Sequence, residues 1–141
     1  MNADSDVNKQ AMRSTVELVR LARSLGDLDQ VAALIEIAEA ALALHSASRD
    51  PDPWITATVA EITGDAMQSV ELYELALQQL KHFPQEPQFE WRISLASRLI
   101  GMGRPMDARS HLLSARAEAA GLGKTKSIER ADQLLSQLAS P

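Results

Sequence analysis

A short pattern that ends one helix and begins the next occurs three times in this 141-residue chain. Each occurrence starts at a glycine, Gly26, Gly64 and Gly103, so the spacings are 38 and 39 residues. Glycine readily adopts the left-handed conformation that ends a helix, and an aspartate, which caps helices well, follows the first two glycines. A nearly constant period of this length is typical of helical repeat proteins. The pattern therefore predicts an all-α fold made of repeated helix pairs.

Residues at fixed distances after each glycine support the repeat. Five, nine and twelve positions on, the three units have Val31, Ser69 and Ala108, then Ile35, Tyr73 and Leu112, then Ala38, Ala76 and Ala115. These positions share one face of a helix, and small residues there let a second helix come close. We expect the alanines of the last set to be close contacts between paired helices.

The segments G-D-A-M-Q-S-V-E-L-Y-E-L-A-L and G-R-P-M-D-A-R-S-H-L-L-S-A resemble the tetratricopeptide repeat. In the third unit, Leu95, Ala96 and Leu99 stand where that family has a leucine, a small residue and an aromatic residue. The period is longer than the family's usual value of about 34 residues, and Trp54 and Trp91 are each one position from the family's tryptophan. The resemblance implies antiparallel helix pairs stacked as a short right-handed superhelix.

We expect a single domain over residues 1–141 with about seven helices. The predicted units are repeats at about 12–49, 50–87 and 88–123 and a capping helix at 125–139. The predicted helices run from 8 to 25, from 27 to 45, from Pro53, from 65 to 82, from 88 to 102, from 105 to 121 and from 125 to 139, after a frayed start.

Two of these helices carry further expectations. The second is rich in alanine on every side and should be among the most enclosed. The last is amphipathic and should cover the apolar side of the final repeat, although a detachable arm that docks onto a partner or a second copy would have the same pattern.

Composition excludes several classes of function. A net charge of −5 argues against nucleic-acid binding, which needs a basic excess. The chain has no cysteine, no apolar run of transmembrane length and no signal-peptide pattern at its start. We therefore expect a cytoplasmic protein that contacts neither membrane nor nucleic acid.

No motif indicates catalysis. The segment G-L-G-K-T-K-S resembles a phosphate-binding loop, but Glu118 occupies the place of that motif's first glycine and a helix precedes it where the motif needs a strand. His45, His82 and His111 fall in different repeats, without metal-ligand spacing. We expect no enzyme activity, no catalytic residue, no cofactor and no metal.

In tetratricopeptide arrays, the first helix of each pair lines a concave groove that holds a peptide or helix of a partner. The resemblance implies a partner-binding surface of Arg13, Val16, Arg20 and Arg23, then Trp54, Thr58 and Glu61, then Glu90, Ile93, Ser97 and Ile100. The three arginines share one helix face that can pair with the carboxylates of an acidic partner. A solvated basic face that offsets nearby acids explains them equally well.

Trp54 and Trp91 have two interpretations. Each can fill the contact between neighbouring helix pairs as a core residue, or lie in the groove as an anchor for the partner. Their offset from the family's tryptophan position leaves both interpretations open.

Two functional hypotheses follow. The first is a small adaptor or chaperone that binds a peptide or helix of another protein in its groove, an architecture that some secretion-system chaperones share. The second is a self-associating structural or regulatory module of a signalling or transcription-regulating assembly, because the third unit is similar to helical repeats of large bacterial transcriptional activators. The chain has no helix-turn-helix segment, so it is not such a regulator itself. A monomer in solution favours the first hypothesis and a stable homodimer the second.

Overall fold

The computed structural model describes residues 3–46 and 52–139, and this part of the chain contains helices and no strand. The helices are α1 (Ala3–Ser24), α2 (Leu28–Ser46), α3 (Pro53–Ile62), α4 (Ala66–Gln79), α5 (Phe89–Gly101), α6 (Pro105–Gly121) and α7 (Thr125–Ala139), with a 3₁₀ turn, η1 (Leu80–His82), after α4. The predicted all-α fold with seven α-helices is confirmed.

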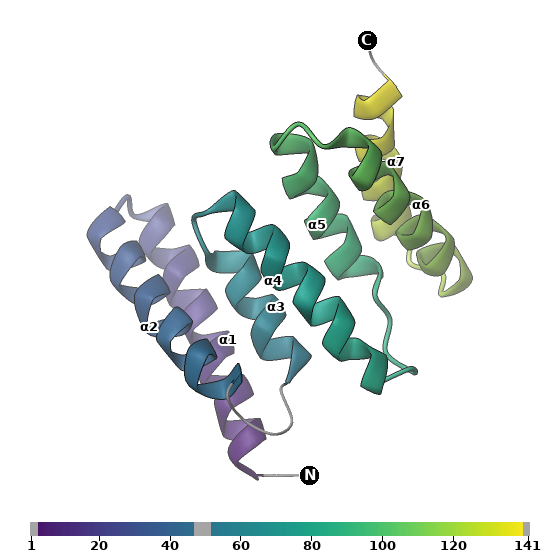
Figure 1. Ribbon diagram of the computed structural model, residues 1–141. Coiled ribbons are helices and arrows are strands. Elements are labelled where there is room, and N and C mark those ends of the chain that lie inside the picture. The colour runs from purple at the N-terminus through teal and green to yellow at the C-terminus, as the bar shows by residue number, and fades with distance from the viewer. Residues whose placement is uncertain (1–2, 47–51, 140–141) are drawn as a thin grey trace.

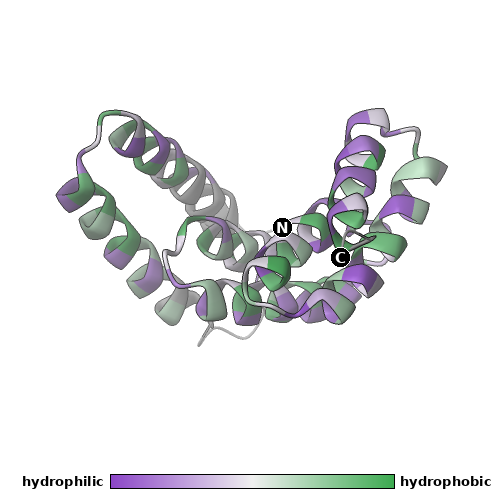
Figure 2. Ribbon diagram, turned by 90° about the horizontal axis from the view of Figure 1, so that it is seen from above, coloured by the Kyte–Doolittle hydropathy of each residue, from purple (hydrophilic) through white to green (hydrophobic). Residues whose placement is uncertain are grey.

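Consecutive helices form antiparallel pairs that stack in a row (Figure 1). The pairs are α1 with α2, α3 with α4 and α5 with α6, and α7 packs on α6 and α5 at the C-terminal end. Helix α3 contacts both helices of the first pair, and α5 contacts α4. Seen from above, the row is bent into a wide V (Figure 2). We call the side formed by α1, α3 and α5 the first-helix side.

Local signals explain most helix boundaries. The carboxylate of Asp65 accepts hydrogen bonds from the backbone N–H groups of Met67 and Gln68, at 2.9 and 3.2 Å, and so caps α4. Gly26 ends its helix with a φ of 73° and Gly103 with a φ of 74°, as expected. Gly64 does not adopt a positive φ, because Thr63 already leaves α3 in an extended conformation.

The buried side chains form two clusters that meet at α3. One cluster spans α3 to α7 and includes Ala57 and Ala60 of α3. The other lies among α1, α2 and α3 and includes Ile55, Val59 and Ile62. Helix α3 therefore has two buried faces.

The alanines of the repeated column all belong to these clusters. Ala76 and Ala115 lie in the larger cluster, Ala38 lies in the smaller one, and all three are buried. Side chains this small allow neighbouring helices to approach closely at these positions.

Two sequence expectations are wrong. Helix α1 begins at Ala3 and not near Asn8, because no glycine or proline interrupts the residues between them. Helix α2 is not enclosed: Ile37 is 62% exposed, and Ala33 and Ala40 are exposed too. Helix α2 is exposed because it belongs to the first pair in the row. Its extensive contacts within the described chain are with α1 and α3.

Helix α7 has the arrangement expected of a cap. Ala131 and Leu134 are buried in the larger cluster. The guanidinium of Arg116 on α6 forms an ion pair of 2.5 Å with Asp132 on α7, and both side chains are about half exposed. Polar residues such as Glu129, Arg130 and Gln133 face solvent.

Candidate functional site

A cleft of about 460 Å³ lies on the first-helix side of the stack. It is lined by Arg20 of α1, by Trp54, Ala57, Thr58 and Glu61 of α3, by Tyr73 of α4, and by Glu90, Trp91, Ser94 and Arg98 of α5. The residues from α3 and those from α5 each recur at three- or four-residue spacing, so each set occupies one face of its helix. The cleft therefore runs along the two helices.

Aromatic side chains form one end of the cleft. The rings of Trp54 and Trp91 meet edge to face, with centroids 6.1 Å apart and planes at 73°. On its other side, the ring of Trp54 meets that of Phe83 at 5.1 Å and 77°. Both tryptophans are half-buried. Each tryptophan packs against another aromatic ring, as a core residue would, and also lines the cleft, where an anchor for a partner would lie.

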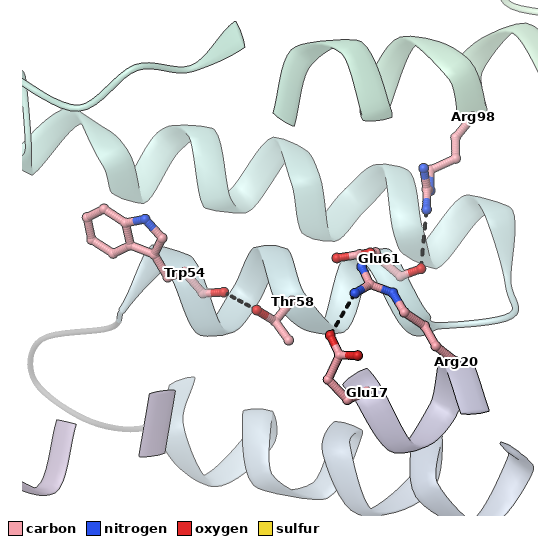
Figure 3. Close-up of polar contacts among 6 residues, drawn as sticks. All are labelled: Glu17, Arg20, Trp54, Thr58, Glu61 and Arg98. Carbon is pink, nitrogen blue, oxygen red and sulfur yellow. Dashed lines mark hydrogen bonds and ion pairs between the residues drawn. The ribbon is translucent and has the colours of Figure 1, made fainter. Parts of the chain in front are cut away.

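Charged side chains form the other end. The guanidinium of Arg20 forms ion pairs with Glu17, at 2.9 Å, and with Glu61 of α3, so that it joins α1 to α3 (Figure 3). The hydrogen bond with Glu61 is the largest cause of a raised pKa of Arg20. All three side chains are exposed, so solvent screens these ion pairs and they add little stability.

Arg98 is held differently, by carbonyl groups and a ring. Its guanidinium donates to the backbone oxygen of Glu61 at 3.3 Å (Figure 3). It also donates to the backbone oxygen of Ser94 at 3.1 Å. It also lies 5.1 Å from the centroid of the Tyr73 ring, close enough for a cation–π interaction. Burial raises the pKa of Tyr73, although the charge of Arg98 opposes this effect.

Two arginines from different helices bind the C-terminal end of α3. Arg23 of α1 donates to the backbone oxygen of Ile62 at 3.0 Å, and Arg98 of α5 donates to that of Glu61. The last carbonyl groups of a helix have no partner within the helix, and positive charge there is favourable. Arg23 was expected to contact a partner protein, but the structure gives it this internal role.

The structure brings only part of the predicted binding surface into the cleft. Arg20, Trp54, Thr58, Glu61 and Glu90 line it. Val16 and Ile93, at 6% and 4% exposed, are core residues and cannot form its apolar floor. Arg23, Ser97 and Ile100 lie outside the cleft lining, and the side chain of Arg13 is outside the described part of the structure.

The face of α5 that lines the cleft differs from the one that the sequence interpretation chose. Phe89, Leu95, Ala96 and Leu99 are buried together with Ile93, which turns Glu90, Trp91, Ser94 and Arg98 toward the cleft. The sequence signal for the cleft-lining face of α5 was a polar residue at every fourth position, Glu90, Ser94 and Arg98. Ala57 and Tyr73 were also missed as lining residues.

The remaining candidates give no second site. Within residues 3–46 and 52–139, no three His, Asp or Glu side chains are grouped so that they could hold a metal ion. Over the same residues, no helix has both the length and the apolar character needed to span a bilayer. The Nδ1 atom of His111 accepts a hydrogen bond from the Arg92 guanidinium at 2.8 Å, away from the cleft lining. Burial, followed by the charge of Arg92, lowers the pKa of His111.

Comparison with known proteins does not identify a family. No protein-family model matches the sequence. No curated protein matches it significantly.

Proposed function

We propose that this chain is a cytoplasmic protein–protein interaction module without enzyme activity, and that its cleft binds a segment of a partner protein. The observation that carries this proposal is the pair of half-buried tryptophans, Trp54 and Trp91, in the wall of an open cleft. Tryptophan and arginine dominate the binding energy of protein interfaces, and the cleft contains two of each.

The dimensions of the cleft favour a short segment as its occupant. From Trp54 to Glu61 the cleft follows seven residues of α3, which is a rise of about 10 Å. An extended peptide covers that distance with about three residues. We further propose that the stacked pairs are degenerate tetratricopeptide repeats, because the first helices α1, α3 and α5 line the cleft in the way that family uses.

The test is to identify a partner by affinity capture and to map its contact with variants. Trp91→Ala should weaken binding about tenfold if the ring is an anchor. The matched control is Leu113→Ala on α6, which removes an exposed apolar side chain outside the cleft lining. Thermal melts of both variants establish that they fold. If Trp91→Ala and Leu113→Ala bind the partner equally well, the cleft is not the binding site.

A second candidate function is self-association, which the exposed leucines of α1 favour. Leu18 and Leu21 lie on one face of α1, Leu25 follows the end of the helix at helical spacing, and each is at least half exposed. The opposite end of the row is covered by α7, whose outward residues are polar. Two copies would therefore meet through their α1 faces in a two-fold dimer.

Light scattering after size-exclusion chromatography measures the oligomeric state and so tests self-association. A dimer that Leu21→Lys converts to a monomer supports it, and a wild-type protein that is monomeric at all concentrations refutes it. The outcome is independent of the cleft, because none of the three leucines lines it.

A further inference from the structure

The two ends of the cleft carry opposite charges that the described part of the chain does not neutralise. Glu90 is exposed in the first turn of α5, beside Trp91, and forms no ion pair with any described residue. Arg98 lies two helical turns further along the same face, and no described carboxylate forms an ion pair with it. An occupant of the cleft would meet a negative end and a positive end.

The other charged groups near the cleft leave this polarity in place. Arg20 is already paired with Glu17 and Glu61. Arg23 and Arg98 also bind the end of α3, so the charged end carries three arginines against these two carboxylates. Glu90 is the charged residue that lines the aromatic end. Arg98 donates to two carbonyl oxygens, which fix its position and leave its positive charge without a counter-ion.

The aromatic end suits a basic side chain in a further way. The aliphatic part of a lysine or arginine packs on apolar surface while its charged group stays in water. A cation is also attracted to the face of a tryptophan ring. Trp54 and Trp91 provide the surface, and Glu90 provides the counter-charge at the same end of the cleft.

We infer that the cleft selects a partner segment that carries one basic and one acidic side chain about 10 Å apart. The basic side chain lies at Trp54, Trp91 and Glu90, and the acidic side chain lies at Arg98. In an extended segment, this separation corresponds to charges about three residues apart. The inference rests on the proposed function and specifies the partner's chemistry.

Intrinsic fluorescence tests the inference directly, because the chain has two tryptophans and both line the cleft. The probes are twelve-residue peptides of Gly, Ser and Ala without tryptophan. Two contain one Arg and one Glu three positions apart, in either order. The comparison peptides carry Arg at both positions, Glu at both, or Ala at both. We expect one of the mixed-charge peptides to bind about threefold more tightly than any comparison peptide.

Reversing the charge at Glu90 tests which end of the cleft binds the basic side chain. Glu90→Lys should remove the preference for Arg and favour the peptide with Glu at both positions. It should leave folding intact, because the exposed side chain of Glu90 forms no hydrogen bond or ion pair with the described residues. The control is Glu74→Lys, which makes the same change of net charge at an exposed position outside the cleft lining. It should not alter the ranking of the peptides.

The outcomes separate this inference from the proposed function. If the peptides bind with equal affinity, or if Glu90→Lys and Glu74→Lys give the same ranking, the charge selection is wrong although the cleft binds peptide. If no peptide changes the tryptophan emission but a captured partner does, the inference also fails and the proposed function survives. If neither peptide nor partner changes the emission, both are wrong.

Discussion

Neighbouring leucines on α6 give a sharp test of how the helix pairs pack. Leu112 is fully buried in the larger cluster, whereas Leu113, the next residue of α6, is 48% exposed. Replacing either by alanine makes the same chemical change in the same helix, with the same small effect on helix propensity. The difference between the two variants therefore measures burial alone.

The burial of Leu112 determines the expected difference in the free energy of unfolding. Replacing a buried leucine by alanine costs about 2–5 kcal/mol, and the cost is high where surrounding helices cannot collapse into the cavity. Leu112 lies between Ala108 and Ala115 on one face of α6, and both alanines are also fully buried. We expect about 3–4 kcal/mol for Leu112→Ala and no more than about 1 kcal/mol for Leu113→Ala, because surface changes have small effects.

Urea unfolding followed by circular dichroism provides the measurement. Leu112→Ala should lower the midpoint with an unchanged slope, as a pure loss of stability does. Its melting temperature should fall by roughly 10 °C for a domain of this size. If the two variants lose equal stability, or if Leu113→Ala loses more, the assigned face of α6 is wrong and the stacking of α5, α6 and α7 must be different.

Three further predictions follow from the packing and the charges. Ala76→Leu should overpack the larger core and cost about 1–3 kcal/mol in the free energy of unfolding; an unchanged melting temperature would contradict the close packing of α4. Deleting residues 125–139 should expose the apolar side of α6 and cause early melting or aggregation; a truncated protein that stays monomeric, equally stable and soluble would mean that α7 is not needed as a cap. The lowered pKa of His111 means that the unfolded chain binds a proton more readily, so stability should fall as pH drops below about 6.5. The melting temperature of His111→Gln should fall less over that pH range than that of the wild type. If the two melting temperatures fall equally with pH, His111 is not the cause of the pH dependence.

Most helix boundaries other than the start of α1 were predictable, because local residues encode them. Asp65 caps α4 through N–H groups two and three residues away, and Gly103 ends its helix with its own conformation. Pro105 begins α6 in its first turn, as a proline can. Such signals require no knowledge of the rest of the fold.

The lining of the cleft was less predictable because it depends on the rotation of each helix about its axis. On α5, Ile93 and Ile100 suggested one face, but the buried group around Leu95 and Leu99 turns Trp91 and Arg98 toward the cleft. Both faces contain apolar residues, so periodicity alone cannot choose between them. The role of Arg23 was equally hidden, since the carbonyl that it binds lies 39 residues away.

The two buried faces of α3 have a consequence for the order in which the molecule opens. In a stack, each pair contacts only its neighbours, so the first pair can separate while α4 to α7 stay packed. The amide protons of α1 and α2 then exchange through this partial opening. Separation of α3 disrupts both clusters at once, because its side chains belong to each. Helix α3 has only ten residues, and it is the shortest of the described α-helices. Its opening is nevertheless the local event that comes closest to complete unfolding.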